Sequence, residues 1–165
     1  MTARKFFMKR SSTLYLKSVL SLIAVTVFAG LLWFPQTEGR AKDLDLISIY
    51  RDPFILFIYI GSIPFFVGLY QAFKLLSFID ANKAFSQGTV NSLRNIKFAS
   101  ICLIVFIVLA LIYIRFFANG DDPAGPTMLG IIVAFAVTII ATAAGIFQKL
   151  LQNAVDIKSE NDLTV

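Results

Sequence analysis

Four stretches of the chain contain no charged side chain, and each is long enough to cross a lipid bilayer. They cover residues 19–35, 53–73, 98–114 and 127–147. About 20 apolar residues in a helix, each adding 1.5 Å, cross the roughly 30 Å hydrocarbon core of a membrane. Because the stretches are continuously apolar, they predict helices and not the alternating strands of a membrane β-barrel.

The composition excludes an ordinary soluble domain. Hydrophobic residues make up 58% of the 165 residues, and charged residues only 15%. A soluble protein of this size could not keep that much apolar surface away from water. We therefore predict an all-α integral membrane protein, a four-helix bundle that forms one membrane domain over residues 1–165.

Proline and turn residues place the predicted helices at residues 14–34, 53–79, 96–117 and 127–157. Residues 158–165 form a polar tail, for which disorder is the default expectation. The first stretch ends in Leu-Leu-Trp-Phe-Pro rather than in a small-x-small cleavage site, so we interpret it as an anchor and not as a removed signal. Pro64 lacks an N–H group, and we expect it to kink the second helix and to act as a hinge.

The distribution of basic residues predicts the orientation. The amino-terminal arm, the middle connection and the carboxyl tail together hold 11 Lys and Arg residues, whereas the two other connections hold 4. Basic residues are concentrated on the cytoplasmic side of membrane proteins. We therefore expect both termini to be cytoplasmic and the protein to lie in the inner membrane of a bacterial cell.

The residues that usually carry catalysis are scarce. There is no histidine and one cysteine, Cys102, which lies within an apolar stretch. No charged residue lies near the middle of a predicted span, where transport and proton-relay sites are found. We expect the hydroxyl groups within the spans to bond to their own backbone or to a neighbouring helix rather than to line a path. The sequence therefore predicts no enzyme, no cofactor and no metal site.

Small side chains recur along one face of the last predicted helix: Gly130, Ala134, Thr138, Ala141 and Gly145. Small residues allow two membrane helices to approach closely. The favoured interpretation is a packing seam inside the bundle, with Gly61 and Gly68 of the second helix as the facing groove. The alternative is the seam of a homodimer.

The predicted cytoplasmic face carries the most informative polar residues. Val90, Leu93 and Ile96 have helical spacing and predict a short amphipathic lead-in to the third helix, with Ser86 or Thr89 as its cap. We expect its apolar face to rest on the bilayer or on the inner ends of the helices. The candidate partner-contact residues on this side are Asp80, Asn82, Lys83, Arg94, Asn153, Asp156, Glu160, Asn161 and Asp162.

Five segments of the chain resemble a bacterial four-helix membrane family that is classed as a domain of unknown function. The segments are residues 63–76, 79–86, 93–97, 148–154 and 158–165. The membrane component of the cytolysin regulator pair in enterococci is similar. Members are often encoded beside a very small helix-turn-helix protein of the Cro/repressor type. The resemblance supplies no catalytic residues, because the family has no accepted ones.

What the resemblance implies is a membrane partner of a transcriptional regulator. The leading hypothesis is a non-enzymatic, membrane-embedded regulatory component that contacts a small DNA-binding protein through its cytoplasmic loop and tail, without touching nucleic acid itself. Two alternatives stay open. One is an immunity protein against a membrane-active peptide, and the other is a small transporter or channel subunit.

Overall fold

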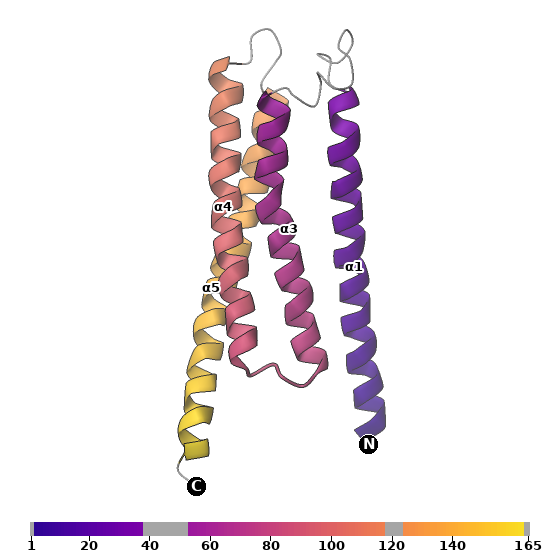
Figure 1. Cartoon of the computed structure of the whole chain (residues 1–165), viewed down its shortest axis with the longest axis vertical. Coiled ribbons are helices and arrows are strands. Elements are labelled where there is room, and N and C mark those ends of the chain that lie inside the picture. Colours follow the sequence, from indigo (N-terminus) through magenta and orange to yellow (C-terminus); the bar gives the residue numbers. More distant parts are fainter. Residues whose placement is uncertain (1, 38–52, 118–123, 164–165) are drawn as a thin grey trace.

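The computed structural model describes residues 2–37, 53–117 and 124–163, which form four long helices (Figure 1). The helices are α1 (Thr2–Thr37), α3 (Pro53–Asp80), α4 (Gln87–Phe117) and α5 (Ala124–Leu163). All four are long and apolar enough to span a membrane, as predicted. The start of α1, the end of α5 and the link between α3 and α4 (residues 81–86) lie at the same end of the molecule, which we call the terminal end (Figure 1).

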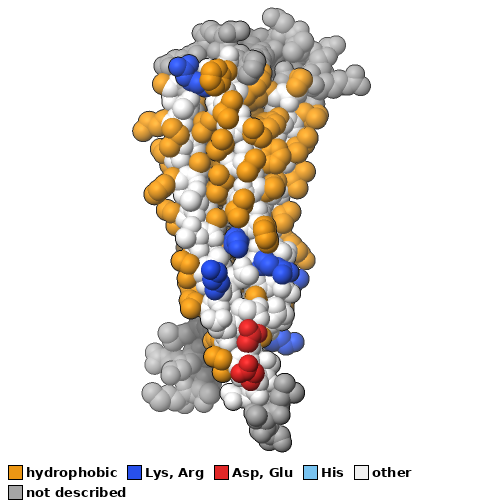
Figure 2. Space-filling model, turned by 90° about the vertical axis from the view of Figure 1, so that its left-hand side faces the viewer, with side chains coloured by type: hydrophobic (Ala, Val, Ile, Leu, Met, Phe, Trp, Pro, Cys, Tyr) orange, Lys and Arg blue, Asp and Glu red, His pale blue; other side chains and the backbone are white. Residues whose placement is uncertain are grey.

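The surface of the helices is apolar over most of its length. Large side chains are strongly exposed on all of them, including Leu22 (67%), Phe116 (75%) and Phe135 (69%). Figure 2 shows hydrophobic side chains covering one face as a broad belt, with basic and then acidic side chains toward the terminal end. An apolar surface of this extent is stable only against lipid. The chain is therefore a multi-pass membrane protein.

Three helices are longer than the sequence predicted. α1 begins at Thr2 rather than at residue 14, and α4 begins at Gln87 rather than at residue 96. The expectation of a disordered tail is wrong over residues 158–163, because α5 continues to Leu163. No glycine or proline interrupts residues 2–13 or 148–163. Once a helix has formed, each further residue adds a hydrogen bond at little cost, so these helices continue past the apolar stretches.

The helices pack in the order of the chain. α1 packs on α3, α3 packs on α4, and α4 packs on α5, which is the most extensive of the three contacts. Among the described residues, α1 makes no comparable contact with α4 or α5. The apolar part of α1 has no residue buried inside the protein. α1 is therefore a peripheral helix that depends on α3 for its position.

Glycines bring α3 and α4 close together. A methyl group on Gly61 would lie 3.2 Å from the ring of Phe106, and one on Gly68 would lie 3.9 Å from Ala99. The ring of Phe57 packs beside that of Phe106, with 5.4 Å between the centroids. From the sequence, the two glycines were expected to form the groove that faces the last helix. That expectation is wrong, because both face α4.

The small residues of α5 also face α4. A methyl group on Gly130 would lie 2.5 Å from Leu111 Cδ2, and one on Gly145 would lie 3.3 Å from Lys97 Cδ. Ala134 and Ala141 are half-buried, whereas Thr138 is exposed. A dimer formed through the two glycines would have to displace α4. This geometry favours the internal seam over the dimer seam.

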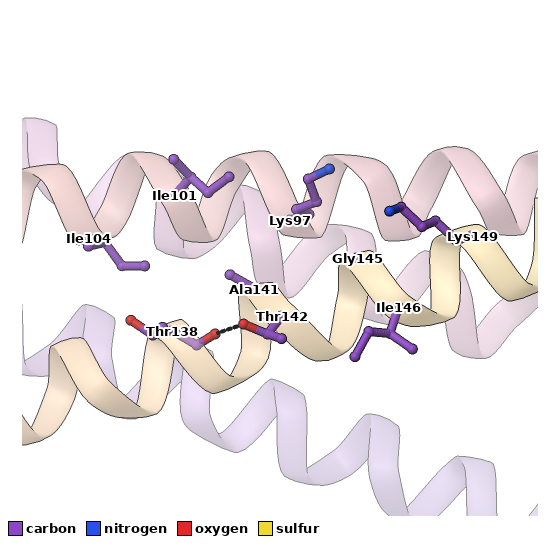
Figure 3. A pocket seen from close by; sticks show the side chains of 9 residues that line it. All are labelled: Lys97, Ile101, Ile104, Thr138, Ala141, Thr142, Gly145, Ile146 and Lys149. Carbon is purple, nitrogen blue, oxygen red and sulfur yellow. Dashed lines mark hydrogen bonds between the residues drawn. The ribbon is translucent and has the colours of Figure 1, made fainter.

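Three hydroxyl groups within the spans bond to the backbone of their own helices. Ser62 donates to the carbonyl oxygen of Tyr59 at 2.7 Å, and Thr138 donates to that of Ala134 at 2.8 Å. Thr142 in turn donates to the carbonyl oxygen of Thr138 at 2.9 Å (Figure 3). These three hydroxyl groups are satisfied locally, as expected for residues that pack rather than line a path.

Pro64 lies inside α3, and the helix continues on both sides of it. The ribbon of α3 changes direction part-way along, and its half nearer the terminal end leans toward α1 (Figure 1). A proline inside a helix removes one hydrogen bond and is a common cause of such a bend. A hinge motion at Pro64 stays a prediction.

Candidate functional site

The link between α3 and α4 begins with a defined helix cap at the terminal end. Asn82 has a positive φ of 57°, in the left-handed region. Its N–H donates to the carbonyl oxygen of Ile79 at 3.2 Å, and the N–H of Lys83 donates to that of Phe78 at 2.8 Å. These two bonds are the Schellman arrangement, which satisfies the last carbonyl groups of a helix. Asn82 therefore ends α3 through its backbone.

The other end of the link is a helix N-cap. The Ser86 Oγ atom accepts a hydrogen bond from the N–H of Thr89 at 3.4 Å, so Ser86 caps α4 as the sequence predicted. The hydroxyl group of Thr89 donates back to the carbonyl oxygen of Lys83 at 3.0 Å. Thr89 is only 2% exposed. The six residues of the link are thus held at both ends by specific hydrogen bonds.

The amphipathic start of α4 is buried against the other helices. Val90 is 2% exposed and Leu93 is 6% exposed, which places them among the most buried side chains of the described chain. Arg94 and Lys83 are exposed. The apolar face was expected to pack either on the bilayer or on the inner ends of the helices, and it packs on the helices. The exposed basic side chains therefore lie beside well-packed apolar residues.

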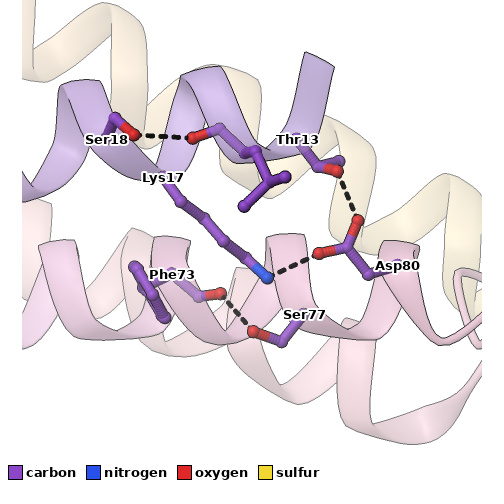
Figure 4. A network of polar contacts seen from close by, with 7 residues as sticks. Thr13, Lys17, Ser18, Phe73, Ser77 and Asp80 are labelled. Carbon is purple, nitrogen blue, oxygen red and sulfur yellow. Dashed lines mark hydrogen bonds and ion pairs between the residues drawn. The ribbon is translucent and has the colours of Figure 1, made fainter. Parts of the chain in front are cut away.

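Asp80 joins α3 to α1 at the terminal end (Figure 4). Its Oδ2 atom lies 2.5 Å from the Nζ atom of Lys17, and its Oδ1 atom accepts a hydrogen bond from the hydroxyl group of Thr13. The Lys17 and Asp80 side chains are 19% and 28% exposed, so the ion pair is partly shielded from solvent. The Lys17 ammonium group also lies 5.4 Å from the ring centroid of Phe73. Asp80 is therefore engaged within the molecule.

The end of α5 continues past Gln152, a residue that bonds to α4. Gln87 and Gln152 exchange hydrogen bonds of 3.2 and 3.5 Å between their side-chain amides. Beyond them, residues 153–163 continue the helix, and we call this segment the arm. The Asp156 carboxylate accepts a hydrogen bond from Gln152 at 2.8 Å. At 1.5 Å per residue, α5 as a whole is about 60 Å long, roughly twice the thickness of a membrane core.

The predicted partner-contact residues fall into two groups at the terminal end. One group lies at the end of α3, in the link and in the first turns of α4: Asp80, Asn82, Lys83 and Arg94. The other group lies on the arm, where the following side chains are exposed: Asn153, Asp156, Glu160 and Asn161. The side chain of Asp162 lies outside the described part of the chain. Asp80 and Asn82 have structural roles of their own, so exposed charge is supplied mainly by Lys83, Arg94 and the arm.

Comparison with known proteins identifies the family. A model described as "Protein of unknown function (DUF2975)" matches residues 15–165. The chain belongs to the DUF2975 family. It is also 40% identical over 160 residues to "Uncharacterized membrane protein YoaS" of Bacillus subtilis (strain 168), a match that covers 96% of this chain and 100% of that protein. No solved structure matches the chain.

The DUF2975 match covers all four helices from Tyr15 onward, including the link and the arm. The name of the Bacillus relative places that protein in a membrane, in agreement with the four apolar helices described above. The resemblance inferred from the five segments of the sequence is therefore confirmed at the level of the family. Neither description states an activity, a ligand or a partner.

Sequence reasoning missed the pairing of Lys17 with Asp80. It counted Lys17 only as one of the basic residues that set the orientation, and it assigned Asp80 to partner contact. A signal was present, because Asp80 is the first acidic residue after the second apolar stretch and Lys17 lies directly before the first. Two opposite charges at the same membrane boundary are expected to pair when their helices are neighbours. The sequence does not show which helices are neighbours.

Proposed function

We propose that this protein is a non-enzymatic regulatory component of the bacterial inner membrane that holds a small DNA-binding protein at the cytoplasmic surface. The observation that carries the proposal is the arm, a helical extension of α5 with an exposed polar surface beside a rigid link. A membrane span alone needs no such extension. An exposed helix beside a second surface is a common way to dock a partner protein.

The charge of the arm supports a DNA-binding partner. Residues 153–163 contain three acidic residues and one basic residue, Lys158. A DNA-binding surface is basic, because it must attract phosphate groups. An acidic helix that covers this surface would compete with DNA for it. The membrane protein would then regulate transcription by sequestration, without a nucleic-acid contact of its own.

The orientation required by the proposal has independent support. The terminal end carries most of the basic residues of the sequence, and this excess is typical of the cytoplasmic side. The described basic residues at this boundary include Lys74, Lys83, Arg94 and Lys97, whereas Arg115 lies at the opposite end of α4. A cytoplasmic DNA-binding protein would therefore meet the link and the arm.

Regulation would require two arrangements of the terminal end that bind the partner unequally. Pro64 divides α3 into two halves, and the half nearer the terminal end carries the link. A bend at Pro64 would move the link relative to the arm. Pro64 is thus the hinge of the proposed switch.

The direct test is co-purification of the full-length protein with the small helix-turn-helix regulator that the family resemblance predicts to be encoded beside it. We expect the double substitution Asp156→Lys with Glu160→Lys to reduce the retained regulator by about tenfold, because attractive charges become repulsive. A second double substitution, Lys83→Glu with Arg94→Glu, tests the link in the same way. Both variants leave the four charge-free stretches unchanged.

Arg115→Glu is the matched control, since it reverses an exposed charge at the opposite end of α4. It should retain the regulator at the wild-type level. Full retention by both terminal-end variants would overturn the proposed contact surface. Absence of any complex with the wild-type protein would overturn the regulatory proposal itself.

A further inference from the structure

A groove of about 440 Å³ lies between α4 and α5, on a surface that faces lipid. Lys97 of α4 and Lys149 of α5 line the part of the groove that is closer to the terminal end of the molecule. Ile101 and Ile104 line it farther into the membrane, and Ile146 lines it between the levels of the two lysines (Figure 3). The groove therefore combines a cationic end with an apolar length.

The two ammonium groups converge across the groove. Figure 3 shows the side chains of Lys97 and Lys149 pointing toward one another from the two helices. Gly145 leaves room for the lysine stem, since a methyl group there would lie 3.3 Å from Lys97 Cδ. No carboxylate in the described part of the chain forms an ion pair with either lysine. Two like charges placed together are stabilised by an anion between them.

The position of the groove across the membrane matches that of a phospholipid molecule in one leaflet. Lys97 directly precedes the charge-free stretch 98–114, and Lys149 lies two residues after the charge-free stretch 127–147. Both lysines thus lie at the boundary where lipid phosphate groups are found. Ile101 and Ile104 follow Lys97 at one and two helical turns, so the apolar part of the groove lies at the depth of the acyl chains.

We propose that this groove binds an anionic phospholipid. Its phosphate group would lie between the ammonium groups of Lys97 and Lys149, in charge-assisted hydrogen bonds. One acyl chain would lie along Ile101 and Ile104. Basic pockets between membrane helices are a recognised site for acidic headgroups. The proposal is independent of the regulatory function above, because none of these residues belongs to the link or the arm.

The test measures lipid retention by native mass spectrometry of the full-length protein purified from nanodiscs. The nanodiscs contain phosphatidylglycerol and phosphatidylcholine in equal amounts. Each lysine near a lipid phosphate contributes about fivefold to affinity, so we expect a preference of about thirtyfold for phosphatidylglycerol. Lys97→Gln and Lys149→Gln should each reduce it about fivefold, and the double substitution should abolish it.

Three control measurements test whether the lipid preference depends on the two lysines of the groove. Lys158→Gln removes an exposed lysine of the same helix outside the groove and should leave the preference unchanged. Lys97→Arg with Lys149→Arg should retain it, because the charge is kept. Soluble glycerol phosphate should not displace the bound lipid, since it lacks the acyl chain. Equal retention of the two lipids by the wild-type protein, equal loss in Lys158→Gln, or displacement by glycerol phosphate would overturn the proposal.

Discussion

At Asn82 the backbone adopts a φ of 57°, which most residues other than glycine avoid. Asparagine tolerates this conformation better than other residues, because its short polar side chain can hydrogen-bond locally. Its N–H and that of Lys83 close the end of α3. Helix termination therefore explains why asparagine occupies position 82, and no contact with a partner protein is needed to explain it.

We expect Asn82→Gly to keep or slightly raise the free energy of unfolding in detergent. Glycine adopts positive φ without steric cost. Asn82→Val should lower the free energy of unfolding by about 1–2 kcal/mol, because a β-branched side chain clashes in this region. Equal stability of the two variants would show that the cap does not depend on residue 82. The partner proposal predicts that Asn82→Gly still retains the regulator.

Single residues differ in how well their roles could be predicted. The cap at Ser86 follows from local chemistry, since a serine before an amphipathic segment satisfies free N–H groups of the first turn. The left-handed residue at Asn82 gave no comparable signal, because many asparagines near helix ends are not in this conformation. The convergence of Lys97 and Lys149 requires knowledge that α4 packs on α5. The sequence does not contain that information in a local form.

At the scale of the elements, α1 has the least extensive packing contact with the rest of the bundle. Its described contacts with α3 include the hydrogen bond from Tyr59 to the carbonyl oxygen of Leu31 at 2.9 Å. The rings of Phe28 and Phe66 meet edge to face, with 6.4 Å between centroids. Near the terminal end, Asp80 binds both Lys17 and Thr13. In lipid, where apolar contact alone drives little association, such polar contacts hold a helix in place.

We expect Asp80→Ala to lower the free energy of unfolding by about 2 kcal/mol, because the Lys17 ammonium group is left partly buried without its carboxylate. Asp156→Ala removes an exposed carboxylate and is the control, with an expected effect below about 0.5 kcal/mol. A double-mutant cycle with Lys17→Ala measures the coupling. If the effects of Asp80→Ala and Lys17→Ala were simply additive, the ion pair would not hold α1 in place.

The number and position of the helices were predictable, but their ends were not. A continuous apolar stretch can be stable only in a bilayer, so composition alone locates each span. The start of α1 and the end of α5 lie outside the charge-free stretches, where hydropathy carries no information about helix formation. There the absence of glycine and proline was the relevant signal. The same signal would have indicated the arm, on which the proposed function depends.

At the scale of the whole molecule, the charge asymmetry and the helix arrangement agree. Four antiparallel helices bring both termini and the link to the terminal end (Figure 1). The sequence concentrates its basic residues in these same segments. A single membrane orientation would then place the arm, the link and the cationic end of the groove at the cytoplasmic surface. Both proposals concern this one surface of the molecule.

The orientation is tested most directly by cysteine labelling in intact cells. The natural cysteine is first replaced by Cys102→Ser, and a single cysteine is then introduced by Gly125→Cys at the start of α5 or by Ser159→Cys in the arm. A membrane-impermeant maleimide should label Gly125→Cys in intact cells, and Ser159→Cys only after the membrane is permeabilised. Labelling of Ser159→Cys in intact cells would contradict the proposed orientation and, with it, a cytoplasmic docking surface.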